Sequence, residues 1–300
     1  MDDYHDVMAI ADVYNGRDHL PSMYEELLAS EKSYVSVIDG EIVAYATSGT
    51  VDSGQTLVIR AGRIKAKYRG QGLHGTFMKY IRKQFAASRV KYEAFSTHIL
   101  TVDVKKNRAT ETCVKNVLCY RFKMKNLRCV SNTTNTEPKR LQTTDLEEVF
   151  SSKPTCGHIF PHGKMIVNWV PFRTWISNID RIIKPNTITL ATSDADRSQN
   201  GVIYTCLTHG SSFRCKIGLA YSVDVFGDDV IEMRKHILEH MKCIQDQVQG
   251  ENDDVSLCLF TSSSVNRADI DGVLADTNLP RHNDNKMYQK MRVFEGPFKV

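Results

Sequence analysis

The residues with the clearest chemical meaning are Arg69-Gly70-Gln71-Gly72, which stand between a β-rich segment and a helical pattern. Glycines let the backbone approach a ligand closely, and the unpaired amides and dipole of a helix N-terminus attract anions. The first helical turn, where Asp and Glu are usual, reads His74-Gly75-Thr76-Phe77. No Gly-Lys-Ser/Thr follows and no βαβ unit precedes, which excludes a Walker loop and a dinucleotide fingerprint. The spacing predicts a site for another phosphate-bearing ligand.

The charge around this loop is strongly positive. Residues 53–92 contain ten basic side chains and no carboxylate, whereas residues 1–52 contain eleven acidic side chains and two basic ones. The net charge of +4 over 300 residues hides this separation. A basic segment is usually a solvated face, but it also suits a multiply charged anion or a nucleic acid. We expect no nucleic-acid partner, because aromatic side chains do not alternate with the basic ones; a nucleic-acid-binding module using residues 53–92 is the alternative from another class.

Composition predicts a cytoplasmic protein with no membrane partner and no metal. No stretch approaches the ~18 apolar residues of a membrane span, Met1–Asp6 is acidic rather than signal-like, and the eight cysteines form no CxxC pair. The run His236–His240 fits the reversed zinc-protease pattern, but no third ligand motif follows. Cys156, His158 and His162 have only a loosely ligand-like spacing.

Hydrophobic periodicity places the glycine loop within an α/β framework in the first half of the chain. Asp39-Gly40 between two β-rich runs predicts a hairpin, and Leu73, Phe77, Ile81 and Phe85 predict one buried helix face. The expected elements are a broken helix at 5–29, strands at 34–38, 42–46 and 56–64, a helix after the loop, a strand at 92–100, a helix at 108–117 and a strand at 119–130.

The second half repeats this order of elements. A polar segment at 131–138 predicts a linker between domains 1–130 and 139–300. Asn200-Gly201 predicts a second hairpin. The expected elements are a helix start at 145–150, strands at 187–191, 202–207 and 213–225, a helix at 228–245, a strand at 255–260, a helix at 265–274 and a strand at 291–294.

With strand, loop and helix in this order, the sequence resembles the GCN5-related N-acetyltransferase superfamily. The superfamily's pyrophosphate loop reads Gln/Arg-x-x-Gly-x-Gly/Ala; Arg69 and Gly72 match, and His74 stands at the last position. The chain is most similar to the histidine N-acetyltransferase subfamily. The matching pieces are Asp18-His19-Leu20-Pro21 with Tyr24, Gly54-Gln55-Thr56, Trp169-Val170-Pro171-Phe172-Arg173 and Asp224-Val225-Phe226-Gly227.

The resemblance implies the fold, the cofactor and the reaction. The expected fold is α/β (α+β), a mixed, mostly antiparallel sheet flanked by helices, with the family's first strand absent before Tyr4 and a degenerate second lobe of the same fold. That lobe would not bind acetyl-CoA, because Asp228 and Asp229 would repel a pyrophosphate. The expected reaction moves an acetyl group from acetyl-CoA to the α-amine of a small amino acid, histidine first. The alternatives are another amine, such as a peptide or polyamine, and a catalytically degenerate CoA-binding protein.

The site residues follow from the same resemblance. The cofactor-binding candidates are Arg63, Ile64, Lys65, Arg69, Gly70, Gln71, Gly72, Leu73, His74, Gly75, Thr76 and Asn107. A backbone N–H of Ile64 or Lys65 is the candidate oxyanion donor.

The superfamily's usual base and acid positions hold Arg60 and Val114. The catalytic candidates are therefore Glu93, His98 and Tyr120. The substrate-binding candidates are Tyr24, Arg173 and Asp224. Arg173 would pair a substrate carboxylate or else form a structural ion pair. The oligomeric state is not predicted.

Overall fold

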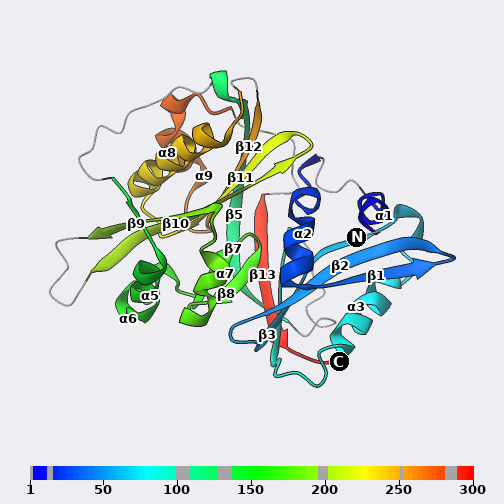
Figure 1. Cartoon of the computed structure of the whole chain (residues 1–300). Coiled ribbons are helices and arrows are strands. Elements are labelled where there is room, and N and C mark those ends of the chain that lie inside the picture. Colours follow the sequence, from blue (N-terminus) through cyan, green and yellow to red (C-terminus); the bar gives the residue numbers. More distant parts are fainter. Residues whose placement is uncertain are drawn as a thin grey trace.

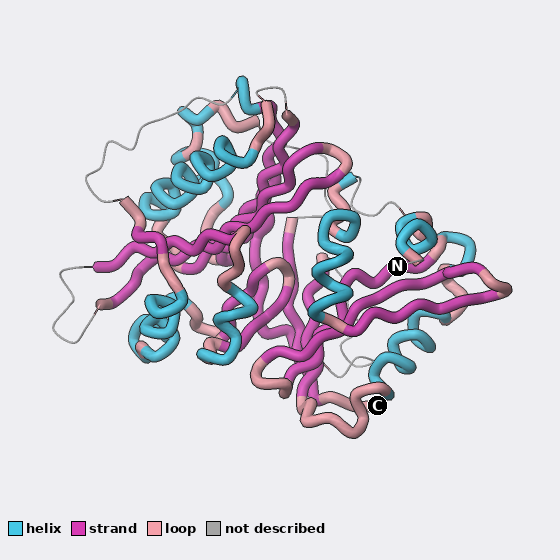
Figure 2. The backbone as a smooth tube through the Cα atoms, viewed as in Figure 1, coloured by secondary structure: helices cyan, strands magenta, loops and turns pink. Residues whose placement is uncertain are grey.

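One large twisted sheet runs through the centre of the protein, with helices on both faces (Figures 1 and 2). The computed structural model describes residues 3–11, 16–98, 109–126, 137–194, 202–250, 253–280 and 289–300. Within these residues the sheet has eleven strands in the order β1-β2-β3-β4-β13-β5-β12-β11-β10-β9-β6. The remaining strands, β7 and β8, form a separate hairpin.

The first half contains the elements around the glycine loop. They are α1 (Tyr4–Met8), α2 (Leu20–Ser30), β1 (Lys32–Ile38), β2 (Glu41–Val51), β3 (Thr56–Ile64), α3 (Leu73–Lys83), β4 (Tyr92–Thr97) and β5 (Thr110–Lys123). The Asp39-Gly40 hairpin is confirmed, since both residues have positive φ (51° and 78°) as a tight β-hairpin turn needs. Phe77, Ile81 and Phe85 pack against one sheet face with Ala44, while Tyr45 packs with α2 on the other.

The second half builds the opposite end of the sheet. Its elements are β6 (Lys139–Arg140), α5 (Thr143–Ser151), α6 (Lys153–Ile159), β7 (Lys164–Val167), β8 (Val170–Arg173), α7 (Ile179–Ile182), β9 (Thr187–Asp194), β10 (Ile203–Cys215), β11 (Gly218–Phe226), α8 (Val230–Gln247), β12 (Asp254–Ser262), α9 (Arg267–Val273) and β13 (Lys290–Pro297).

The two halves of the chain share this one sheet. The C-terminal strand β13 lies between β4 and β5, and β5 pairs with β12 of the second half. Residues 131–136 of the predicted linker lie outside the described residues. Among the described residues, β1 and β6 are the two edge strands of the sheet, and no strand of that part of the chain pairs with the outer edge of β1.

Two predicted elements are wrong. The helix expected at 108–117 is largely β5, a strand of 14 residues flanked by β12 and β13. Its pairing partners lie much further along the chain, so the residues next to it in the sequence do not show that it is a strand. The single strand expected at 213–225 is two strands, β10 and β11, joined at Lys216-Ile217. Gly218 after the turn has φ 122°, and a Cβ there would lie 2.1 Å from the Asp254 carbonyl oxygen.

The histidines of the zinc-like pattern are structural in α8. Thr208 Oγ1 lies 2.9 Å from His236 Nδ1 and 2.9 Å from His240 Nε2, and Tyr221 Oη lies 3.0 Å from His240 Nδ1. Burial lowers the pKa of His236 to about 3 and holds the pKa of His240 well below its ordinary value. Both rings are therefore neutral partners in a hydrogen-bond chain between α8 and the sheet.

This chain leaves no room for a side chain at position 210. A Cβ on Gly210 would lie 2.5 Å from the His240 ring and 2.5 Å from Tyr221 Oη. We expect Gly210→Ala to lower the free energy of unfolding by about 2–3 kcal/mol through overpacking. Urea denaturation measures this loss. Gly157→Ala in α6, where no heavy atom lies within 4 Å, is the matched control and is expected to lose nothing; equal losses in both variants would contradict the overpacking.

Candidate active site

The glycine loop forms an open helix N-terminus. Gly70 and Gly72 have φ of 78° and 79°, and Gly72 caps α3 without any side-chain hydrogen bond to its first-turn amides. Positive φ favours glycine over every other residue. A Cβ on Gly70, Gly72 or Gly75 would meet nothing within 4 Å, so the surface above the loop is open. The first turn of α3 holds no acidic residue. These amides are available to an anion.

The corresponding turn of the second half has the opposite chemistry. The Asp229 carboxylate caps α8 and accepts hydrogen bonds from the N–H groups of Ile231 (2.8 Å) and Glu232 (3.2 Å). Its negative charge occupies the position at the helix N-terminus that a phosphate would take. Of these two helix starts, only α3 presents an anion site.

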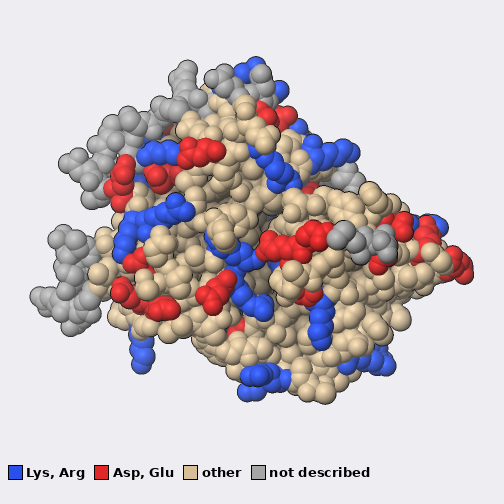
Figure 3. All heavy atoms as spheres, viewed as in Figure 1, with Lys and Arg blue, Asp and Glu red and all other residues tan. Residues whose placement is uncertain are grey.

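Acidic side chains from outside the basic segment neutralise about half of it. Five of its ten basic residues form ion pairs: Arg60 with Glu31, Arg63 with Asp18, Lys65 and Lys67 with Glu41, and Arg82 with Glu93. In the described part of the chain, Arg69, Lys79, Lys83, Arg89 and Lys91 have no such pair. Figure 3 shows acidic and basic side chains interspersed over the face drawn there. This pattern favours a compact anion over a long nucleic-acid backbone.

Beside the loop, β3 separates from β4. The two parallel strands pair only from Thr56 to Val58, and a bulge at Ala61, with φ 55°, shifts the register between β3 and β2. The Lys65 N–H donates to the Val43 carbonyl (2.9 Å), so it is not the oxyanion donor. Because backbone groups alternate along an antiparallel strand, the Ile64 N–H points away from β2, into the opening, while the Ile64 carbonyl accepts a hydrogen bond from Arg69 Nε at 3.0 Å.

One predicted cofactor residue, Arg63, acts differently from the expectation. The Arg63 side chain is buried and donates to both carboxylate oxygens of Asp18, at 2.7 and 3.1 Å. Asp18 also accepts the Leu20 N–H at 3.0 Å, so this ion pair attaches the start of α2 to β3. Only the backbone of Arg63 is available to a ligand. Asn107 lies outside the described residues.

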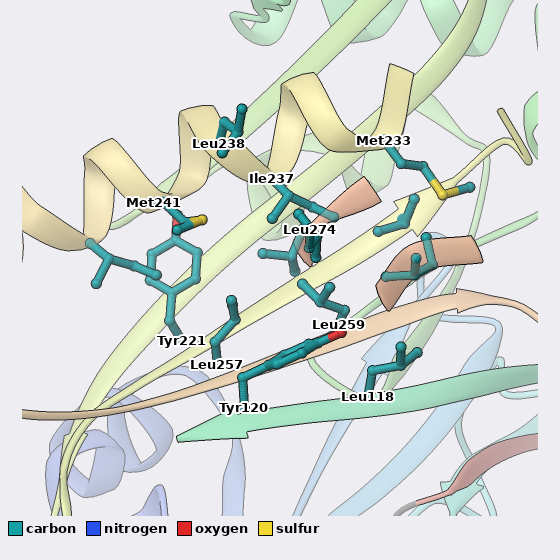
Figure 4. Close-up of a cluster of buried hydrophobic side chains, with 14 of the residues drawn as sticks. Leu118, Tyr120, Tyr221, Met233, Ile237, Leu238, Met241, Leu257, Leu259 and Leu274 are labelled. Carbon is teal, nitrogen blue, oxygen red and sulfur yellow. The ribbon is translucent and has the colours of Figure 1, made fainter. Parts of the chain in front are cut away.

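The three catalytic candidates are far from equivalent. Glu93 is held by Arg82 of α3 through two hydrogen bonds, of 2.7 and 2.8 Å. Tyr120 is 2 % exposed, lies among the apolar side chains under α8 (Figure 4) and donates to Asp271 at 3.3 Å. His98 directly follows β4, at the end where β3 and β4 have separated. Burial lowers the pKa of His98. Of the three candidates, His98 is the one that lies at the opening between β3 and β4.

The three substrate-binding candidates do not form one pocket. Tyr24 is a core residue beneath α1, with its ring 5.2 Å from that of Tyr4. Arg173 donates to Glu295 at 2.8 Å and lies 3.5 Å from Asp52. Of the two alternatives for Arg173, the structure therefore shows the structural ion pair. Asp224 is 1 % exposed, and it serves a different purpose from contact with a substrate.

Asp224 anchors the turn between β7 and β8. Its Oδ2 accepts the Asn168 N–H at 3.2 Å, and its Oδ1 lies 3.7 Å from Lys115 Nζ. Burial raises the pKa of Asp224 to about 6 and lowers that of Lys115. Two motifs far apart in the sequence, at 169–173 and 224–227, are thus connected by one carboxylate.

That turn presents Trp169, a half-buried residue packed against an apolar cluster. Asn168 and Trp169 both have positive φ (49° and 68°), a strained conformation for tryptophan. The indole lies edge-to-face against His98, with centroids 6.4 Å apart, and against Phe260 at 5.6 Å. Strain of this kind is common at ligand sites, so the positive φ of Trp169 marks this turn as a candidate ligand contact.

Within the described residues, no helix is long and apolar enough to cross a membrane. The same part of the chain gathers no group of three or more His, Cys, Asp or Glu side chains that could hold a metal ion.

Solved structures share this fold. Over 99% of this chain and 78% of the other, it matches Saccharomyces cerevisiae N-myristoyltransferase, solved with myristoyl-CoA and inhibitors, with a TM-score of 0.54 and 9% identity. A Pyrococcus horikoshii structure described as an acetyltransferase matches over 100% of this chain and 87% of its own, with a TM-score of 0.52 and 10% identity. The protein has the mixed, mostly antiparallel α/β fold of GCN5-related acetyltransferases.

The sequence comparisons are more specific. Residues 134–261 match the family described as "Histidine N-acetyltransferase, C-terminal". The histidine N-acetyltransferase of Oreochromis niloticus is 21% identical over 266 residues, which cover 80% of this chain and 77% of the relative. The resemblance to the histidine N-acetyltransferase family, indicated by the motifs, is confirmed.

Proposed function

We propose that the protein is an N-acetyltransferase that moves an acetyl group from acetyl-CoA to the α-amine of a small amino acid, with histidine the first candidate. The observation that carries this proposal is the open N-terminus of α3 at Gly72, beside the separated edge of β3. Residues 1–130 would hold acetyl-CoA, and residues 139–300 would form the degenerate lobe. The free thiols of the described cysteines suit the cytoplasm, where we expect the protein to act.

The residues divide the chemistry among them. The pyrophosphate of acetyl-CoA would accept hydrogen bonds from the first-turn amides of α3, with Arg69 as a nearby cation. The thioester would lie along the opened edge of β3, where the Ile64 N–H donates to the developing oxyanion. His98, directly or through a water, would take the proton from the attacking amine. The coenzyme A thiolate leaves as the amide bond forms.

His98 is the catalytic residue with the clearest test. We expect His98→Asn to lower kcat by about 100-fold and to leave the KM for acetyl-CoA unchanged, because the base is lost and the loop is not. Since burial lowers its pKa, His98 is neutral at pH 7 and protonates only below its ordinary value of 6.5. The acidic limb of the wild-type kcat profile is expected there and absent in the variant. Glu93→Gln is the control and is expected to retain kcat; a larger loss there than in His98→Asn would reverse the assignment.

Thiol release in the presence of single acceptors tests the function itself. A panel of free amino acids, peptides and polyamines is expected to give turnover with histidine or another small amino acid. Turnover with peptides or polyamines alone would replace the acceptor class. Acetyl-CoA binding without turnover would support the degenerate cofactor-binding protein. Retention on DNA with steep salt dependence, without acetyl-CoA binding, would support the nucleic-acid alternative.

A further inference from the structure

Two thiols face each other at the centre of the sheet. Cys119 of β5 and Cys258 of β12 are direct partners in the antiparallel register, and their sulfur atoms are 3.2 Å apart. Directly opposed residues of antiparallel strands have Cα atoms roughly 4.5–5.5 Å apart, within the range that a disulfide spans. The sulfurs need to approach by only about 1 Å to reach bonding distance. The backbone is already in place for a cross-strand disulfide.

The surroundings make one of these thiols the nucleophile. Arg17 donates to Ser256 Oγ at 3.4 Å, two residues before Cys258 on the same strand. The hydrogen bond from the Cys258 thiol, helped by the positive charge of Arg17, lowers the pKa of Cys119, while the pKa of Cys258 is raised. Thiolates rather than thiols react with oxidants.

The other described cysteines lack this activation. Burial raises the pKa of Cys113, Cys156, Cys206, Cys215 and Cys243. Cys119 is 8 % exposed and Cys258 is half-buried. Among the described cysteines, the lowered thiol pKa and the close contact between sulfur atoms thus occur at the same pair, Cys119 and Cys258.

We propose that Cys119 and Cys258 form a redox-modification site that closes to a disulfide on reaction with a hydroperoxide. The Cys119 thiolate attacks one peroxide oxygen; an S–O bond forms, the O–O bond breaks, and hydroxide (or the alkoxide of an organic hydroperoxide) leaves. The Cys258 sulfur then attacks the Cys119 sulfenic acid; the S–S bond forms, the S–O bond breaks, and water leaves. The two thiols together lose two electrons and two protons. Hydrogen peroxide is reduced to two waters.

The pair lies beside the segment that anchors α2 to β3. Arg17 precedes Asp18, which holds Arg63 on β3. Closing the disulfide removes the thiolate that faces Arg17. Oxidation therefore changes the charge beside Arg17, the residue before Asp18, and does not involve the glycine loop.

Counting thiols tests the proposal without any measurement of activity. The full chain is treated with hydrogen peroxide, quenched, unfolded and titrated with a thiol reagent. We expect the eight thiols of the chain to fall to six, with one cross-linked peptide pair containing Cys119 and Cys258. Cys119→Ser should abolish the loss, and Cys113→Ser, a half-buried thiol of the same apolar cluster, should not affect it.

A second variant separates the chemistry from folding. In Cys258→Ala the sulfenic acid has no resolving thiol, so we expect dimedone to label Cys119 and circular dichroism to match the wild type. An unchanged count of eight thiols in the wild type, a disulfide between other cysteines, or absence of dimedone labelling at Cys119 would each overturn the proposal. None of these outcomes depends on acetyl transfer, so this proposal and the proposed function are tested independently.

Discussion

Gly72→Glu is expected to weaken acetyl-CoA binding by at least about 100-fold, which amounts to loss of saturable binding in a calorimetric titration. The carboxylate would stand at the N-terminus of α3, where the pyrophosphate has to accept hydrogen bonds from the first-turn amides. The backbone contributes as well, because the φ of 79° at this position disfavours any side chain. Charge repulsion and the lost fit of the loop act in the same direction.

Gly163→Glu is the matched control for this variant. Gly163 has φ 62°, and a Cβ placed there would meet nothing within 4 Å, as at Gly72, but it directly precedes β7 in the second half of the chain, outside the glycine loop. Backbone strain and added charge are therefore the same in both variants. We expect Gly163→Glu to bind acetyl-CoA as the wild type does. Unchanged binding by Gly72→Glu would reject the loop as the cofactor site.

Lys115→Met is expected to cause the largest loss of stability, about 3 kcal/mol near pH 8 in the free energy of unfolding. Removing the ammonium leaves the Asp224 carboxylate buried without a counter-charge. The loss depends on pH. Burial already raises the pKa of Asp224 to about 6, and without Lys115 it rises further above the unfolded value near 3.8. Between about pH 6 and this higher pKa, the folded variant therefore keeps a proton that the folded wild type and the unfolded chain have both released.

The sign of this dependence is therefore fixed. The destabilisation relative to the wild type should be small below about pH 6, where Asp224 is protonated in both folded proteins, and should grow toward pH 8 by up to about 1.4 kcal/mol per pH unit, in urea denaturation at a series of pH values. Lys115→Met with Asp224→Asn is the control, since the neutral amide still accepts the Asn168 N–H. The double variant should recover much of the loss and lose the pH dependence. A loss that is equal at pH 5 and pH 8 would show that Asp224 is not the cause.

The parts of the fold that the sequence predicts well depend on neighbours in the chain. The hairpin at Asp39-Gly40, the strand Thr56–Ile64 and the apolar face of α3 each follow from turn chemistry or from a period of two or 3.6. The open loop at Gly72 is of the same kind, because its glycines and the missing first-turn carboxylate are visible within a few residues. Position 229 likewise places a carboxylate at the start of α8.

How distant side chains use each other's charge depends on the tertiary structure. Arg63 belongs to Asp18, Glu93 to Arg82 and Arg173 to Glu295, and two of these pairs join residues at least 45 positions apart. A charged side chain that looks available in the sequence must find a partner once it is buried, and the partner depends on which strands become neighbours. Long-range pairing also makes residues 110–117 a strand, since β12 and β13, from the far end of the chain, pair with them.

The anion loop can therefore be predicted from the sequence, because a loop is made by local backbone conformation. Which of the three catalytic candidates lies beside the opened edge of β3 could not, because only long-range strand pairing places it there.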